Sequence, residues 1–189
     1  MRQTKTNGFA LLLALIVSSV VLAIGISILD LSINQLTLSS TSRESEVAFQ
    51  AAHAGVDCQW YWRYELASQY TAADAAVPNP SINCFGGTPI SSSKLREYQD
   101  PAFGYVDLFV SIFNWGDPKR CTRTQMYVFN ATAGDLVFPF TNTAIGDNGT
   151  KTCKKGNTCT VLVSDGYNLS CDNLTSGVFA VQRELTVEF

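Results

Sequence analysis

Among the residue types in this sequence, cysteine most clearly indicates a particular chemistry. No two of the six cysteines form a C-x-x-C pair, and they stand at positions Cys58, Cys84, Cys121, Cys153, Cys159 and Cys171. Zinc sites usually combine closely spaced cysteines or several histidines, whereas this chain has a single histidine. An even number of cysteines behind an apolar N-terminal segment indicates disulfides formed in an oxidising compartment, rather than reduced thiols.

The pairing of these cysteines stays open, because six cysteines can be joined in many ways and the sequence does not choose among them. One pair has a local signal. Cys153 and Cys159 flank the turn-forming stretch "KKGNT", which is typical of a hairpin closed by a disulfide.

His53 is a second candidate for chemistry. Asp57 lies four residues further along the same predicted helix, with Cys58 next to it. A nucleophile and its base must meet in a cleft, and no nucleophile elbow of the form G-x-S-x-G is present. We therefore expect His53, the only histidine, to lie on the helix surface or at a subunit contact.

Oxygen ligands for a metal ion occur in predicted loops, at Asp147, Asn148, Asp165 and Asp172. Calcium-binding loops arrange such residues as D-x-[DN]-x-[DN]-G, an array that this sequence lacks. The stretches "DNG" at 147–149 and "DG" at 165–166 are instead typical of tight turns. We expect no metal, no cofactor and no enzymatic activity, with metal binding by these loops as the alternative.

An aromatic cluster lies near the end of the predicted helix, at Trp60, Tyr61, Trp62 and Tyr64. Such rings can form a platform on which a ligand stacks. More often they fill the junction between a helix and the domain that it enters, and we favour this second interpretation.

The charge of the chain argues against a nucleic-acid partner. The chain has 13 Lys and Arg against 16 Asp and Glu, for a net charge of −3. Neutralising phosphates requires clustered basic residues, and the densest basic spot beyond the N-terminus is the pair Lys154–Lys155. Two lysines do not make a basic patch.

The elements that position these residues begin with a long helix, predicted over about residues 9–68. The first proline is Pro78, and the only glycines between residues 9 and 70 are Gly25 and Gly55. The first part of this helix, Phe9–Leu29, is uncharged and long enough to cross the roughly 30 Å hydrocarbon core of a membrane.

Beyond Leu29 the predicted helix becomes amphipathic. It includes a serine-rich stretch at 39–42, where the low helix propensity of serine would allow a bend. Two neighbouring apolar stripes recur at helical spacing, the first at Val47, Ala51, Ala54, Cys58 and Trp62, the second at Phe49, Ala52, Val56 and Trp60. We expect a sheet to cover the stripe from Val47 to Trp62, whereas the apolar run before it finds no cover within the chain.

Strand-like runs separated by turn signals follow residue 70. They are Tyr105–Trp115, Gln125–Ala131, Cys159–Ser164 and Val178–Phe189. In the last run, polar residues alternate with an apolar face made by Phe179, Val181, Leu185, Val187 and Phe189. The predicted fold class is α+β, with a long N-terminal α-helix packed at its C-terminal half on an antiparallel β-sheet head of residues 70–189.

The N-terminal stretch "KTNGFALLLALIVSSVVLAIGISIL", Lys5 to Leu29, fits two ordinary interpretations incompletely. A secretory signal peptide has a basic start, an apolar centre of about 7–15 residues and a small-residue cleavage site, and the apolar run here is longer. A single-pass membrane anchor fits the length better, but it does not explain the sequence Asn7-Gly8-Phe9.

At these residues the chain resembles the type IV pilin family. That family begins with a short basic leader ending in Gly, followed by Phe and a long apolar helix, and "TNGFALLLALIVSSVVLAI" has this order. The downstream stretch "SSTSRESEVAFQAAHAGVDC" is similar to the N-terminal pattern of PilX-type minor pilins. The resemblance covers about residues 1–58, and the head resembles no named family.

The resemblance implies that a prepilin peptidase cuts between Gly8 and Phe9, removing the leader 1–8, and that the new amine of Phe9 is methylated. The apolar helix 9–29 then anchors the chain in the membrane and packs against other pilin subunits. Its anchoring and assembly residues would be Phe9, Leu13, Val17, Val20, Ile24 and Ile28. Residues 30–69 continue the helix, and the head 70–189 is extracytoplasmic.

One position departs from the family. Pilins generally have Glu at the fifth residue after the cut, where this chain has Leu13. In the family, this loss accompanies minor or tip subunits. The resemblance thus implies a minor pilin-like structural subunit assembled into or at the tip of a pilus, and exposed on the cell surface. Its partners would be the membrane, other pilins and the prepilin peptidase, with no small-molecule substrate.

Two alternatives remain open. The chain is equally compatible with a pseudopilin of a type II secretion system. A protein of another class would be a single-pass, membrane-anchored extracytoplasmic binding module that belongs to no filament.

Overall fold

The computed structural model describes residues 7–72, 78–84, 86, 89–100, 102–141, 145–146, 148–175 and 180–189. The chain divides into two compact units, an N-terminal unit that ends at Arg43 and a head unit, Glu44–Phe189. Helix α1 (Asn7–Glu65) begins in the first unit and ends in the second. The predicted long helix is therefore present.

The end of the predicted helix differs slightly from the expectation. After α1, Leu66 forms a turn, and a short helix α2 (Ala67–Tyr70) follows. Helical hydrogen bonding continues through the serine-rich stretch at 39–42, where the Thr41 hydroxyl donates to the Thr37 carbonyl, so no break occurs there.

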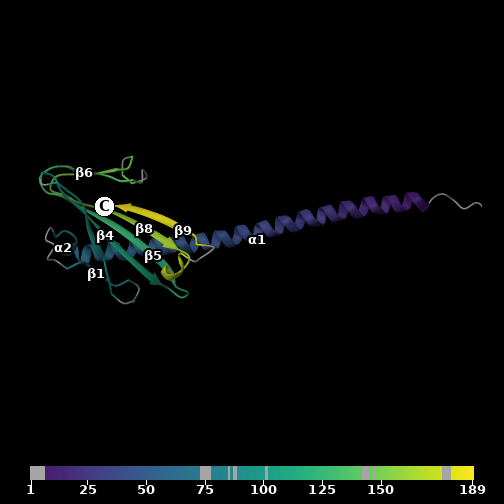
Figure 1. The fold of residues 1–189 in the computed structure, drawn as a ribbon, viewed down its shortest axis with the longest axis horizontal. Helices are drawn as coiled ribbons and strands as arrows, with labels where there is room; N and C mark the ends of the chain where they lie inside the picture. Colours follow the sequence, from purple (N-terminus) through teal and green to yellow (C-terminus); the bar gives the residue numbers. More distant parts are fainter. Residues whose placement is uncertain are drawn as a thin grey trace, which may run out of the picture. The chain divides into compact units, whose positions relative to one another are not determined.

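The head unit contains a five-stranded antiparallel sheet in the order β3-β4-β5-β8-β9 (Figure 1). Its strands are β3 (Ser93–Asp100), β4 (Gly104–Trp115), β5 (Arg120–Ala131), β8 (Thr158–Tyr167) and β9 (Gln182–Glu188). Two small antiparallel pairs accompany it: β1 (Ser81–Ile82) with β2 (Ile90–Ser91), and β6 (Leu136–Pro139) with β7 (Thr150–Cys153). A 3-10 helix, η1 (Cys171–Asn173), follows β8. The predicted α+β class with an antiparallel sheet is confirmed.

All four predicted strand-like runs contain strands, but their bounds differ. β5 begins at Arg120 rather than Gln125, and β8 continues to Tyr167 rather than ending at Ser164. β9 begins at Gln182, and Phe179 lies outside the described residues. Strand β3 was not predicted, because most of its residues are exposed and only weakly patterned.

The prediction of a turn at Asp165-Gly166 is wrong, because both residues lie inside β8. Asp165 is buried and accepts a hydrogen bond from the Gln182 side chain on β9, while Gly166 faces α1. The turn predicted at 147–149 is confirmed for Asn148 and Gly149, which have φ angles of 53° and 82°, and Asp147 lies outside the described residues.

The two faces of the five-stranded sheet have separate cores. The C-terminal part of α1 and helix α2 lie along one face, where the core consists of Val56, Tyr70, Phe109, Met126, Val128 and Leu162 (Figure 1). Leu185, Val187 and Phe189 of the last run pack against this core, as predicted. The other face forms a core with β6 and β7, which includes Val106, Phe129, Leu136, Cys153 and Val161.

The sheet covers the predicted stretch of α1, but the most deeply buried positions are mainly small residues. Its buried residues are Ala48, Ala51, Ala52, Gly55, Val56 and Gln59. Ala51, Ala52 and Val56 were predicted, but Phe49 and Trp60 are exposed. The physical reason lies in the sheet, which presents the short side chains of Thr122, Thr124 and Ser164 to the helix, so small helical residues approach it most closely.

Candidate functional site

The predicted processing site lies at the beginning of α1. The helix begins at Asn7, so the bond between Gly8 and Phe9 falls in its first turn, and residues 1–6 lie outside the described part. The first turn contains no acidic side chain, although a helix N-terminus favours one. The Phe9 ring is 73% exposed.

The six side chains predicted to anchor and assemble the chain share one property in the structure. Each is more than half exposed within the chain: Phe9, Leu13, Val17, Val20, Ile24 and Ile28. Over the most apolar 18-residue window of this helix, the mean hydropathy is 2.8 and no part is buried. Leaving a large apolar side chain in water costs about 1.5–3 kcal/mol, so this surface requires a lipid or protein environment. By length and composition, the helix can span a membrane.

Three serine hydroxyls of the N-terminal unit donate to the helix itself. Ser19, Ser27 and Ser32 donate to the carbonyls of Ile16, Ala23 and Ile28 at 2.8–3.0 Å. An unpaired hydroxyl is costly in an apolar environment, and these bonds remove that cost without any partner chain. These three serines are thus compatible with burial in lipid or among helices.

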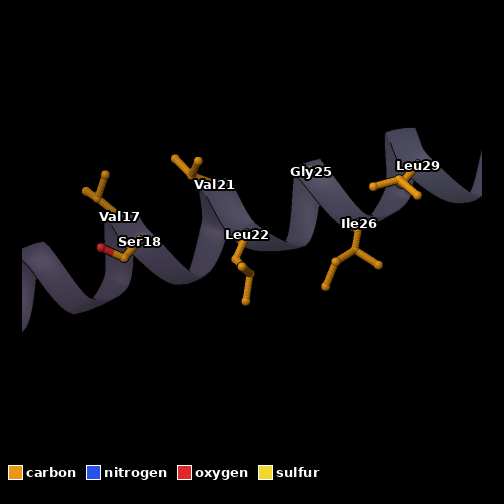
Figure 2. Close-up of a pocket in the computed structure, with 7 residues that line it drawn as sticks. All are labelled: Val17, Ser18, Val21, Leu22, Gly25, Ile26 and Leu29. Atoms are coloured by element: carbon orange, nitrogen blue, oxygen red, sulfur yellow. The ribbon is translucent and has the colours of Figure 1, made fainter.

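A shallow groove, which the sequence analysis missed, lies along this helix at Gly25. It is lined by Val17, Ser18, Val21, Leu22, Gly25, Ile26 and Leu29. Figure 2 shows Val21 and Leu29 projecting on either side of Gly25, where no side chain fills the space. A Cβ added at Gly25 would have no neighbour within 4 Å. Small residues such as Gly and Ser let two apolar helices approach closely.

The six cysteines of the head unit form three disulfides, Cys58–Cys84, Cys121–Cys171 and Cys153–Cys159. The prediction of disulfides is confirmed, and so is the local pair Cys153–Cys159. The predicted hairpin is wrong, because β7 pairs with β6 whereas β8 pairs with β5 and β9. This disulfide therefore joins two different sheets.

His53 lies on the exposed surface of α1, as predicted. Its Nδ1 atom is 3.1 Å from Asp57 Oδ2, and these two side chains are 60% and 68% exposed. Cys58 is bonded to Cys84 and offers no thiol nucleophile. Among the residues that the structure describes, no three His, Cys, Asp or Glu side chains come together as metal ligands.

The predicted helix–head junction is confirmed for two of the four clustered aromatic residues. Trp62 packs against the core formed by Ile82, Cys84 and Phe113, and its Nε1 donates to the Asn83 carbonyl at 3.0 Å. Trp60 lies 4.2 Å from Phe189 between ring centroids. Tyr61 and Tyr64 are more than half exposed.

A buried charge cluster on β3 and β4 was not predicted from the sequence. The carboxylate of Asp107 is fully buried, lies 3.3 Å from Lys94 Nζ and accepts hydrogen bonds from Arg96. The Arg96 guanidinium in turn lies 4.2 Å above the Tyr105 ring, whose hydroxyl donates to the Thr71 carbonyl. The alternation of Lys94 and Arg96 was the only available signal, and it does not reveal the partner on another strand.

This cluster fastens the chain just after α2 to the sheet. Lys94 Nζ donates to the Ala72 carbonyl at 3.0 Å, and Asn130 donates to the Tyr105 hydroxyl at 2.7 Å. Burial raises the pKa of Tyr105, and the Asn130 amide partly offsets this rise. The arrangement is that of a structural connection, since every polar group in it bonds to another part of the chain.

Comparisons of the chain with models of protein families, with curated proteins and with solved structures find no match. The architecture is compatible with that of a pilin: a long helix is apolar in its N-terminal part and packs on an antiparallel sheet in its C-terminal part.

Proposed function

We propose that this chain is a minor type IV pilin-like structural subunit. In this proposal a prepilin peptidase removes residues 1–8, the apolar helix first anchors the subunit in the membrane, and it later packs against other subunits in or at the tip of a pilus. The head unit stays extracytoplasmic throughout and finally lies on the cell surface.

One observation carries the proposal: the uncharged run Phe9–Leu29 directly follows Gly8, and its large side chains have no cover within the chain. Exchanging lipid for neighbouring helices keeps this apolar surface out of water in both states. The groove at Gly25 supports helix packing, because it lets a second helix approach closely. The three disulfides support an extracytoplasmic head.

Leu13 favours a minor or tip position over the repeating shaft. If the new amine of Phe9 became buried among apolar helices without a carboxylate at residue 13, its charge would be costly. In a subunit at the tip, or in one present in few copies, this amine is seldom buried among other helices, so the cost seldom arises.

Mass spectrometry of the mature protein tests the processing step. The expected mass is that of residues 9–189 with one added methyl group on the amine of Phe9. A protein that keeps Met1, or one that begins after Ala23, contradicts the proposal.

Purification of filaments from the native host separates the proposal from a binding module. A minor pilin is expected in sheared surface filaments at far fewer copies than the main subunit. A secretion pseudopilin would be processed identically, but its deletion would stop export of other proteins rather than change pili. A membrane-anchored binding module would remain with the membrane fraction and keep residues 1–8.

A further inference from the structure

The contact between α1 and the sheet differs from ordinary apolar packing. At its centre the sheet donates hydrogen bonds directly to helix carbonyls: Thr122 Oγ1 to Ala51 at 2.8 Å and Ser164 Oγ to Ala52 at 2.7 Å. These carbonyls lie inside α1 and already belong to its own hydrogen-bond ladder. The sheet hydroxyls therefore bond to the backbone of the helix itself, in addition to the helix's own hydrogen bonds.

The Thr122 hydroxyl also has a second partner on the sheet. The Trp115 indole N–H, which can only donate, donates to the same Thr122 oxygen at 2.9 Å. The Thr122 hydroxyl thus accepts from Trp115 and donates to the Ala51 carbonyl at the same time. About two turns after Ala51 along α1, Gln59 Nε2 donates to Thr124 Oγ1 at 2.8 Å.

Because small residues hold α1 and the sheet in close contact, α1 cannot slide along the sheet unless the two first move apart. A Cβ added at Gly55 would overlap Ser164 and Thr122, and one added at Gly166 would overlap the backbone of α1 between Ala48 and Ala52. The side chains of Thr122 and Ser164 thus stand against the helix backbone. A shift by one helical turn would bring larger side chains, such as Gln59, against the same positions.

A covalent bond adjoins these contacts. Cys58, one turn after Gly55, is joined to Cys84, which lies beyond the end of α2 in the chain. If the helix separated from the sheet, this disulfide would still hold residue 58 to the head.

We propose that these residues form an axial lock, defined as Gly55, Thr122, Ser164 and Gly166 with the Cys58–Cys84 disulfide, which transmits a pull along α1 to the head without sliding. The inference rests on the proposed function, since a filament subunit anchored by its helix experiences such a pull. The lock itself is a property of the head unit and can be measured without any filament.

The orientation of α1 on the sheet defines the pulling geometry. Glu44 bonds to Asn168 after the end of β8, while Arg63 bonds to Thr160 near its start, so the helix and β8 run in opposite directions. Exposed Glu46 and exposed Lys155, in the turn before β8, therefore lie toward opposite ends of the contact. Pulling them apart loads the contact in shear.

The experiment uses optical tweezers on the purified full chain in detergent, with handles attached through click-reactive residues introduced at Glu46 and Lys155. A second molecule has its handles at Glu46 and Lys119, in the β4–β5 turn. Because Cys121 pairs with Tyr167, this turn lies at the Asn168 end of β8, so the second geometry peels the helix from the sheet. We expect the shear geometry to withstand a higher force.

Ser164→Ala is the decisive variant, because it removes one helix contact and leaves the Ala52 carbonyl bonded within α1. At equal shear force we expect rupture to be about 2- to 10-fold faster, the change expected for one lost hydrogen bond. Ser93→Ala is the matched control, since its hydroxyl bonds to the Val110 carbonyl away from α1, and its rupture rate should not change. An equal effect of Ser164→Ala in both geometries, or none in shear, overturns the axial lock.

The double variant Cys58→Ser with Cys84→Ser tests the covalent part. With the disulfide present, residues 59–83 are excluded from extension, so the length released on rupture should be about 80–90 Å shorter than in the variant. Equal lengths would contradict the role of this bond. None of these outcomes bears on processing at Gly8–Phe9, so failure of the lock and failure of the proposed function are distinguishable.

Discussion

Gly55 shows how a residue that weakens a helix can be required by its tertiary contacts. Glycine inside a helix costs about 1 kcal/mol relative to alanine, and beyond its first turn α1 contains glycine at Gly25 and Gly55. The two positions have opposite surroundings, because an added Cβ at Gly25 meets nothing within 4 Å whereas one at Gly55 meets the sheet. The same residue type therefore serves contact with the sheet at one position and leaves a groove at the other.

The pair of variants Gly55→Ala and Gly25→Ala tests this difference. Gly55→Ala should lower the free energy of unfolding of the head by about 1–3 kcal/mol, because its methyl group overpacks the contact. Gly25→Ala, the control in the same helix, should leave this free energy within about 0.5 kcal/mol of the parent value. Denaturant titration in detergent, followed by tryptophan fluorescence, measures both. Equal stability of the two variants would contradict the close contact.

Glu188 gives the head a pH-dependent contribution at its surface. The Lys151 ammonium, 2.6 Å away, and the Gly146 N–H hold the pKa of this carboxyl below its ordinary value. A carboxyl with a lowered folded-state pKa stabilises the fold above its unfolded pKa, and the stabilisation is lost as the pH falls through the folded pKa. Both side chains are partly exposed, which limits the contribution to about 0.2–1 kcal/mol.

Lys151→Gln isolates this contribution. At pH 7 the variant should be less stable than the parent by about 0.2–1 kcal/mol, since the ion pair is absent. Below the lowered pKa of Glu188 the carboxyl is protonated in both proteins, so their stabilities should converge. Denaturant titrations from pH 7 down to pH 3 measure the difference, and a difference that stays constant over this range argues against the ion pair as its source.

At the scale of elements, each disulfide of the head joins different parts of the fold. Cys58–Cys84 joins α1 to the segment before β2, Cys121–Cys171 joins β5 to η1, and Cys153–Cys159 joins β7 to β8. A cross-link stabilises mainly by restricting the unfolded chain, and the effect grows with the length of the closed loop. The sequence separations are 26, 50 and 6 residues in this order.

Replacing each pair by two serines should reveal this order. The chain-entropy relation gives losses of about 4 kcal/mol for Cys121–Cys171, about 3.5 for Cys58–Cys84 and about 2 for Cys153–Cys159. Denaturant titration of the three double variants measures these values. If the shortest loop gave the largest loss, native contacts of the Cys153–Cys159 bridge, rather than loop closure, would dominate its effect.

At the scale of the whole molecule, the two units differ in what they need from their surroundings. The head unit has a core on each face of its sheet, whereas the large side chains of Phe9–Leu29 are exposed within the chain. We therefore expect the apolar segment to need lipid or protein around it, and the head to fold on its own contacts.

Removal of the N-terminal unit tests this division. A fragment of residues 44–189, expressed in an oxidising compartment, should be monomeric and folded without detergent, because it keeps every disulfide and both cores. The full chain should need detergent or lipid under the same conditions. Size-exclusion chromatography and circular dichroism compare the two, and an aggregated or unfolded fragment would show that the head depends on the apolar helix.

The sequence by itself determined the features that depend on neighbouring residues. The uncharged run after Phe9, the presence of one long N-terminal helix, the α+β class and the presence of disulfides all follow from local patterns of apolarity, breakers and cysteine count. The N-terminal resemblance also depends on a short contiguous stretch, and it leads to the proposed function rather than to a demonstrated one.

Only the tertiary structure decided which distant residues meet. The pairing of Cys58 with Cys84, the burial of Asp107 between two cations and the position of Gly166 inside a strand are all set by packing between segments far apart in the chain. The buried face of α1 is the clearest case. Apolar periodicity predicted two stripes that mix large and small side chains, and the hydroxyl-bearing strands cover mainly the alanine and glycine positions, because a helix can approach a sheet closely only where both surfaces are small.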